Sequence, residues 1–463
     1  MSNTLSIKEY FSYFKDRRLI NIFIFGMASG FPWVLIGSVM SAWLKDEGLS
    51  RSTIGLFGIV FGVYSINFLW SPLIDRIKLP FLYKKLGQRR SWIFICQLVI
   101  VLATFSLSQL VIKDQLFLAA LFCFVVALAS ATQDISIDAF RIDTLAESES
   151  HKTTAAAAMA TSGWWSGYAL LGAIPFYIAD FPNWQWADVY LILTGLMLLL
   201  CFAVFFAKEP TSNRDIIQAE LERNYQLALA NSQFQLKALQ KPIAWLMVTL
   251  IEPFKVFFKK NGVKSALALL AFIFLFKIGE AFLARMSIVF YKEIGFSNTQ
   301  IANYSKLGTG IITIIFAFFG SIFNHRYGIV KGLMISGIAM AASNLMFSVI
   351  AIQGPKEHLY VLAIIIDGFT QAWSLVAMVA FISMLCDRAF TATHYALLAS
   401  LGNLGRTVLS SYSGVVIDDW LNGNWALFFV LTALMVIPSL LFLWLIRKKL
   451  YILEKNFHAT SRR

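Results

Sequence analysis

Long hydrophobic runs recur along the entire chain, and they constrain the fold more than any other feature of the sequence. Hydrophobic residues make up 58% of the 463 residues and charged residues only 14%, compared with about 25% charged residues in soluble domains. Each run is long enough to cross a hydrocarbon core of about 30 Å. Because a backbone in lipid must satisfy its own hydrogen bonds, such spans are helical. The sequence therefore predicts an all-α polytopic membrane protein.

The runs predict twelve spans, and the charges between them predict an orientation. The spans lie near 19–44, 52–75, 91–112, 115–140, 153–179, 187–207, 264–290, 299–323, 329–352, 359–385, 392–418 and 425–446. An even number of spans places both termini on one side, where the loops hold most of the lysines and arginines. The opposite loops hold only Lys45, Arg51, Lys113, Lys292 and Lys356. Because cytoplasmic loops are enriched in Lys and Arg, we expect both termini to be cytoplasmic.

The longest connection divides the spans six and six. We expect an N-terminal transmembrane half (1–207), a cytoplasmic linker with amphipathic helices (208–263), a C-terminal transmembrane half (264–450) and a cytoplasmic tail (451–463). The apolar stretch at 242–262 ends in basic residues and is expected to lie flat on the inner leaflet, with a thirteenth span as the alternative. Two six-span halves around a long cytoplasmic loop resemble the plan of major facilitator superfamily transporters, whose halves are parallel repeats.

Charged residues inside the spans are the candidate functional groups, because a central charge costs about 2.5–3.5 kcal/mol on insertion scales. In SATQDISIDAFRID (130–143), helical spacing places Asp134, Asp138 and Arg141 on one face. Two like charges one turn apart suit a proton carrier, so Asp134 and Asp138 are the predicted proton-coupling residues. The alternative is a structural ladder of ion pairs. Gln133, in the same stretch, is a candidate substrate-binding residue.

Span seven and span eleven hold the other central charges. Lys277 and Glu280 share a face in FKIGEAF, either as cargo-binding groups or as a self-satisfied pair. Arg406 lies among Gly and Ser, and its forked guanidinium suits a carboxylate of the cargo or of another span. Lys306 and Asp367 are expected nearer the outer surface, where they are hydrated.

Two further groups of residues are functional candidates because of their positions in the chain. Asp75 and Arg76, with the GQRR sequence at 87–90, form the cytoplasmic elbow between spans two and three and are candidate gating residues, together with Arg141. Plain topology signalling is the alternative for Asp75 and Arg76. Trp164 and Trp165 are candidates for stacking on sugar faces, with core packing as the alternative.

Several function classes are excluded by the sequence. The net charge of +13 could suggest nucleic acid, but the basic residues cluster in loops between hydrophobic runs. The four cysteines fall in or beside apolar runs without metal-ligand or CxxC spacing, so no metal site or disulfide framework is expected. No nucleophile–base grouping favours an enzyme, and no G-x-x-x-x-G-K-[ST] sequence favours an ATP-driven pump.

Several sequences occur together in an order that resembles the AmpG-type muropeptide permeases. They include FLWSPLIDR (68–76), SATQDISIDAF (130–140) and FKIGEAF (276–282), and the similarity runs through almost all twelve spans. The TQDI-x-x-D portion also resembles acetyl-CoA transporters. The resemblance implies a bacterial inner-membrane importer of N-acetylglucosamine–anhydro-N-acetylmuramic acid and its peptides. It implies a proton gradient as the driving force, no other cofactor, the lipid bilayer as surroundings, and a monomer. A transporter of another anionic metabolite such as acetyl-CoA is the alternative.

Overall fold

The computed structural model describes residues 7–179, 181–231, 237–296, 300, 304 and 308–459, and all regular structure in this part is helical. The first half contains α1 (Ile7–Ser12), α2 (Arg17–Val34), α3 (Met40–Asp46), α4 (Arg51–Phe57), α5 (Val63–Ile66), α6 (Ser71–Arg76), α7 (Leu82–Leu86), α8 (Gln88–Ser108), α9 (Leu116–Thr144), α10 (Thr153–Trp165), α11 (Gly172–Ala179) and α12 (Trp186–Phe206).

The remaining helices form the central connection and the second half. The connection contains α13 (Arg214–Asn231), α14 (Lys237–Leu246) and α15 (Glu252–Asn261). The second half contains α16 (Val263–Leu275), α17 (Ile278–Glu293), α19 (Thr309–Tyr327), α20 (Ile329–Gln353), α21 (Glu357–Leu385), α22 (Thr391–Ser410), α23 (Ser413–Val415), α24 (Trp425–Leu434) and α25 (Ile437–Ala459).

The predicted spans coincide with helical segments of the structure. Within the described residues, eight helices are long and apolar enough to cross a membrane. The other four predicted spans are also helical where they are described, but they are interrupted or carry more small and polar residues. Span two, for example, is divided into α4, α5, α6 and short 3-10 turns.

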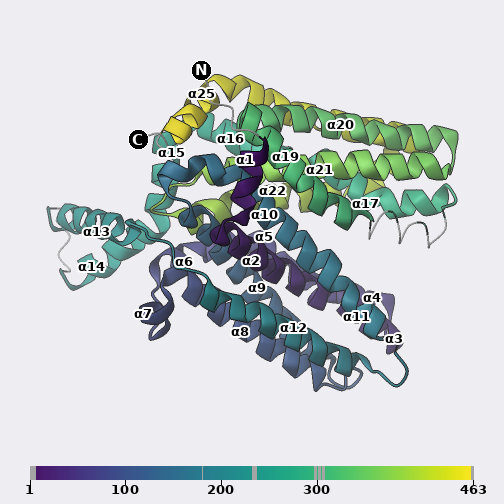
Figure 1. Ribbon diagram of the computed structural model, residues 1–463, viewed down its shortest axis with the longest axis horizontal. Coiled ribbons are helices and arrows are strands. Elements are labelled where there is room, and N and C mark those ends of the chain that lie inside the picture. Colours follow the sequence, from purple (N-terminus) through teal and green to yellow (C-terminus); the bar gives the residue numbers. More distant parts are fainter. Residues whose placement is uncertain are drawn as a thin grey trace.

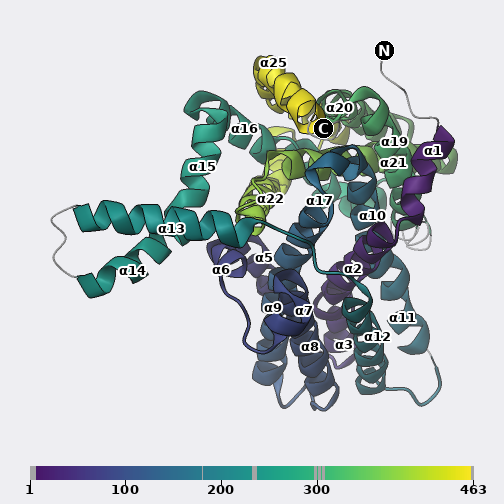
Figure 2. The same cartoon turned by 60° about the vertical axis from the view of Figure 1, so that its left-hand side comes forward.

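The two halves meet at one end of the bundle and diverge toward the other. Both termini lie at the end where the halves meet, here called the terminal end, and α13 and α14 project from it as a hairpin (Figures 1 and 2). The opposite end, where α3 is followed by α4 and α11 by α12, is here called the distal end (Figure 1). Contacts between the halves are made mainly by α10 with α19 and α21, and by α22 with α5, α6 and α9.

Glycines set the close packing of α2 against α10. Gly26 and Gly30 on α2 face Gly163 and Gly167 in the span that begins with α10. A Cβ added at Gly30 would lie 2.1 Å from the Trp164 carbonyl oxygen, and one at Gly167 would lie 2.2 Å from the Met27 carbonyl oxygen. Small residues four apart on both helices allow such a close approach of backbones. The crossing holds the first and fifth spans together beside the candidate site.

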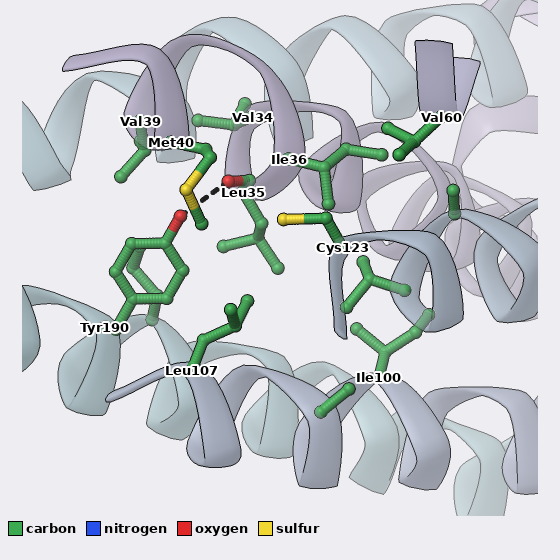
Figure 3. Packing of buried hydrophobic residues seen from close by; sticks show 14 of the residues in the cluster. Val34, Leu35, Ile36, Val39, Met40, Val60, Ile100, Leu107, Cys123 and Tyr190 are labelled. Carbon is green, nitrogen blue, oxygen red and sulfur yellow. Dashed lines mark hydrogen bonds between the residues drawn. The ribbon is translucent and has the colours of Figure 1, made fainter. Parts of the chain in front are cut away.

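The core of the N-terminal half packs α2 and α3 against α8, α9 and α12 (Figure 3). After Pro32, the helix widens into a π-helical turn at Leu35–Val39. Proline removes a backbone donor and disturbs the regular helix. The Tyr190 hydroxyl donates a hydrogen bond of 2.7 Å to the Leu35 carbonyl at this turn (Figure 3). A polar group inside the apolar core is thereby satisfied.

Span seven is also broken, at Phe276 and Lys277, where α16 ends and α17 begins. Gly279 lies directly after the break, and a Cβ added there would lie 2.1 Å from the Thr432 carbonyl oxygen. The absence of a side chain at Gly279 therefore lets α17 approach α24 closely. The break itself places Lys277 in a non-helical conformation at the start of α17, in the middle of the span.

Candidate functional site

The two acidic residues of α9 have different surroundings. The Ser29 hydroxyl on α2 donates a hydrogen bond of 2.6 Å to the Asp134 carboxylate. Asp138 lies one turn further and forms an ion pair of 3.1 Å with Arg141, whose side chain is only 1% exposed. In the part of the chain that the structure describes, no cation lies within 4 Å of Asp134. Asp134 therefore accepts a hydrogen bond from a neutral donor, whereas Asp138 is compensated by a positive charge.

Gln133 points toward a neighbouring helix. Its side-chain amide donates a hydrogen bond of 2.8 Å to the Ala28 carbonyl on α2, and the residue is fully buried. This bond joins α9 to α2. In this arrangement Gln133 is a packing residue, and its predicted contact with cargo would require it to turn.

Aromatic side chains from three spans form an aromatic cluster, which consists of Trp33, Phe61, Tyr64, Trp164, Trp165 and Tyr168. One member, Tyr64, lies within electrostatic range of Asp134. The Trp33 ring centroid lies 4.3 Å from that of Tyr64 and 5.9 Å from that of Trp164. Trp164 and Tyr168 are stacked with centroids 5.1 Å apart. The sequence indicated only Trp164 and Trp165, which are adjacent; no two of the other members are adjacent in the sequence.

The central charges of the second half form another group. Lys277 pairs with Glu280 and donates a hydrogen bond of 2.7 Å to the Ser374 hydroxyl on α21. Both charged residues are 8% exposed. Arg406 is half-buried and lies within electrostatic range of Lys277. Among the residues that the structure describes, Arg406 has no ion-pair or hydrogen-bond partner. It is thus the cation of this group that is available to an anion.

Asp75 joins the two halves at the terminal end. This buried carboxylate accepts hydrogen bonds from the backbone amides of Ala392 (3.3 Å) and Thr393 (2.9 Å) and from the Thr393 hydroxyl (2.7 Å). These amides belong to the first turn of α22, whose N-cap residue, Phe390, has no side-chain acceptor. A carboxylate at this position also interacts favourably with the helix dipole. Asp75 therefore caps a helix of the other half.

A second helix end is capped in the opposite direction. The Arg388 guanidinium, in the second half, donates hydrogen bonds to the carbonyls of Ile142 and of Leu145, the latter at 2.9 Å. These carbonyls lie at the C-terminal end of α9, where a positive charge is favourable. The Thr391 hydroxyl donates to Asp143 (2.8 Å) close by. Each half thus supplies a charged cap to a helix of the other half.

Two buried arginines support these caps. Arg89 donates hydrogen bonds to Asp75 (2.8 Å) and Asp143 (2.9 Å). Arg141 donates to the Ser383 hydroxyl (2.8 Å) and lies 5.0 Å from the Tyr395 ring centroid, so that it contacts the second half through α21 and α22. The sequence indicated the region of Arg89 through GQRR. It gave no signal for Ser383 or Arg388.

Arg76, the other candidate gating residue of this elbow, bonds to α13 and, among the described residues, not directly to the second half. Its guanidinium pairs with Glu222 (3.1 Å) and donates to Gln218 (3.1 Å), both on α13. Gln218 in turn donates to the Ala389 carbonyl of the second half (2.7 Å). Helix α13 therefore bridges both halves across the terminal end.

An ion pair of 2.5 Å between Lys78 and Asp215 lies at the start of α13. Hydrogen bonding to the Asp215 carboxylate raises the pKa of Lys78. The pair is exposed to solvent, so its contribution to holding α13 in place is small.

The comparisons with known proteins agree with this architecture. The family described as Major Facilitator Superfamily matches residues 22–322. "Putative transporter AmpG 4" of Rickettsia felis is 32% identical over 444 residues, which cover 95% of this chain and 99% of that protein. "Anhydromuropeptide permease" of Escherichia coli K12 is 29% identical over 458 residues, which cover 98% of this chain and 84% of that protein.

Solved structures confirm the predicted fold class. The proton:xylose symporter XylE superposes with a TM-score of 0.62 at 14% identity, covering 95% of this chain and 96% of that one. The E. coli fucose:proton symporter FucP superposes with a TM-score of 0.64 at 14% identity, covering 94% and 98%. The chain therefore belongs to the Major Facilitator Superfamily of transporters, which are not enzymes, and is related to the AmpG-type anhydromuropeptide permeases over nearly its full length.

Proposed function

We propose that this transporter imports anhydromuropeptides from the periplasm to the cytoplasm of a bacterium by alternating access, driven by protons. The kinship to the anhydromuropeptide permease of E. coli suggests the cargo. The basic loops favour a cytoplasmic terminal end. The observation that carries the mechanism is the reciprocal capping of helix ends by Asp75 and Arg388, which closes one end of the bundle between the halves.

The aromatic cluster and Arg406 are the proposed contacts for the two chemical parts of the cargo. Rings that already stack on one another, such as Trp164 and Tyr168, offer flat faces to the sugar rings. Arg406 would bind a carboxylate of the stem peptide, which suits its planar guanidinium. Lys277 and Glu280 would take part when their mutual ion pair opens.

Asp134 and Asp138 are the proposed proton-coupling residues. Asp134 bonds to a neutral hydroxyl at the centre of the N-terminal half, and an uncompensated charge there is costly. Asp138 is linked through Arg141 to Ser383 of the second half, so its charge state bears on a contact between the halves. Protonation of Asp134 or Asp138 would therefore influence how firmly the terminal end is closed.

The proposed gate comprises Asp75, Arg76 and Arg141. Asp75 and Arg141 hold the two halves together directly. Arg76 acts through α13, which bonds to the Ala389 carbonyl of the second half. Opening of the terminal end would require these contacts to be released together.

Uptake of labelled anhydromuropeptide into proteoliposomes, with and without an imposed pH gradient, tests the proposal. Accumulation that depends on the gradient is the expected result. The Asp134→Asn and Asp138→Asn variants should lose this accumulation, and normal uptake by both would refute their assignment. If labelled anhydromuropeptide is not taken up, uptake of labelled acetyl-CoA that unlabelled anhydromuropeptide does not reduce would transfer the proposal to an acylated anionic cargo.

A further inference from the structure

A third acidic residue lies at the centre of the membrane-spanning region, in the half opposite to Asp134. Asp367 is on α21, ten residues after Glu357. At about 1.5 Å per residue this places it about 15 Å into the span, close to the middle of a hydrocarbon core of about 30 Å. Whereas the sequence suggested a hydrated position near the surface, the structure shows Asp367 only 6% exposed.

The hydrogen bonds of Asp367 come from neutral groups. The Ser343 hydroxyl on α20 donates to one carboxyl oxygen at 2.9 Å, and the Gln371 amide donates to the other at 2.6 Å. Thr370 lies 3.1 Å from the Ser343 hydroxyl and extends this network. Among the described residues, no cation lies within 4 Å of Asp367. A buried carboxylate without a countercharge is strongly disfavoured.

The charged groups that face Asp367 are already engaged or more distant. From the start of α17, Lys277 and Glu280 act on Asp367 electrostatically, but they are paired with each other. Lys277 is further fixed by Ser374, which lies two turns along α21 from Asp367. Arg406 on α22 lies within electrostatic range of Lys277, and Lys306 lies outside the residues that the structure describes. A proton is therefore the simplest countercharge for Asp367 in this arrangement.

We propose that Asp367 binds and releases a proton during the transport cycle, as a coupling carboxylate of the second half; this inference rests on the proposed function. The proton enters from water at the distal end and binds the carboxylate while Lys277 is held by Glu280. When the ion pair opens and the ammonium group of Lys277 moves along α21 from Ser374 toward Asp367, the carboxyl group of Asp367 ionises against this ammonium group. The proton then leaves to water at the terminal end.

The test compares Asp367→Asn with the wild-type protein in proteoliposomes. Two readouts are needed: exchange of labelled anhydromuropeptide at equal pH on both sides, and accumulation under a pH gradient. We expect the variant to retain exchange and lose accumulation, and Asp367→Glu to restore accumulation. Retained accumulation by Asp367→Asn, with the proton movement of the wild type, would overturn the proposal. Absence of exchange by the wild-type protein would instead refute the proposed cargo.

A second measurement covers the case in which Asp367→Asn does not fold. Dicyclohexylcarbodiimide reacts with protonated carboxyl groups in apolar surroundings, and mass spectrometry locates the modified residue in the wild-type protein. Modification of Asp367, reduced by alkaline pH, is the expected result. An unmodified Asp367 in a protein whose Asp134 is modified would overturn the proposal.

Discussion

Removal of the Asp75 carboxylate should open the terminal end. Asp75→Ala eliminates all three hydrogen bonds that this side chain accepts from the first turn of α22. Two of them are the backbone bonds that a helix N-cap normally makes, and loss of an N-cap costs about 0.5–2 kcal/mol. The bond between Arg89 and Asp75 lies within one half, so its loss affects both conformations and cancels in the equilibrium between them.

We therefore expect the closed conformation to lose about 2 kcal/mol, which corresponds to about a 30-fold change in the ratio of closed to open molecules. Thr393→Val removes only one of the three bonds, worth about 1 kcal/mol, and should shift the same ratio about fivefold. The graded response distinguishes a cap from a general loss of folding.

Distances between spin labels on the two halves measure this equilibrium. Lys84 on α7 and Lys331 on α20 are exposed at the terminal end, and the four native cysteines are buried, so cysteines introduced at the two lysines can be labelled selectively. Asp75→Ala should add a longer distance to the distribution. Asp46→Ala is the matched control, because Asp46 bonds to Trp186 within one half at the distal end. An Asp75→Ala distribution identical to that of this control would refute the capping argument.

Three further predictions follow from particular contacts. Arg388→Ala removes the cap at the end of α9, so the same label pair should show a shift in the direction of Asp75→Ala, and an unchanged distribution would contradict the reciprocal arrangement. Gly30→Val should lower the thermal stability in detergent strongly, because its Cβ would lie 2.1 Å from the Trp164 carbonyl oxygen, whereas Gly195→Ala, with open space around it, should not. Hydrogen bonding to Arg18 lowers the pKa of Glu149 to about 2, so the stability from this pair is present above the usual pKa of 4.5 and is lost as the pH falls toward 2. Glu149→Gln should therefore lower the melting temperature at pH 7 and make much less difference near pH 2, where the Glu149 carboxyl is protonated; an equal effect at both pH values would argue against this pair.

The membrane fold could be predicted from the sequence because its determinants are local. A hydrophobic run long enough to span the bilayer specifies a helix by itself, and the basic loops suggest its orientation. The charged residues were equally visible, because an ionisable group such as Asp134 or Lys277 stands out in an apolar span. Their partners were not visible, since Ser29 and Ser374 resemble any other small polar residue of a span.

The gate shows where prediction from sequence stops. Asp75 and Arg76 are adjacent, yet they bond to different elements, one to α22 and the other to α13. The acceptors of Arg388 are backbone carbonyls, which have no sequence signature at all. Helix ends become binding groups only when the tertiary structure brings a charge to them, so the reciprocal caps could be recognised only in three dimensions.

Capping helix ends is well suited to a closure that must be reversed in every cycle. In the apolar cluster beside Asp75, Ile74, Ile135 and Ala139 of the first half meet only small side chains of the second half, Ala392 and Ala396. The hydrogen-bonding groups at the helix ends can bind water after the halves separate, which limits the cost of opening. With about 2 kcal/mol per cap, the closed end is stabilised by a few kcal/mol. A ligand that binds one of two conformations more tightly than the other by about 5.5 kcal/mol reverses a 99:1 ratio of these conformations. The stabilisation of the closed end is of similar size. In the proposed cycle, cargo and proton together therefore need to supply only a free energy of this size to exchange one open end for the other.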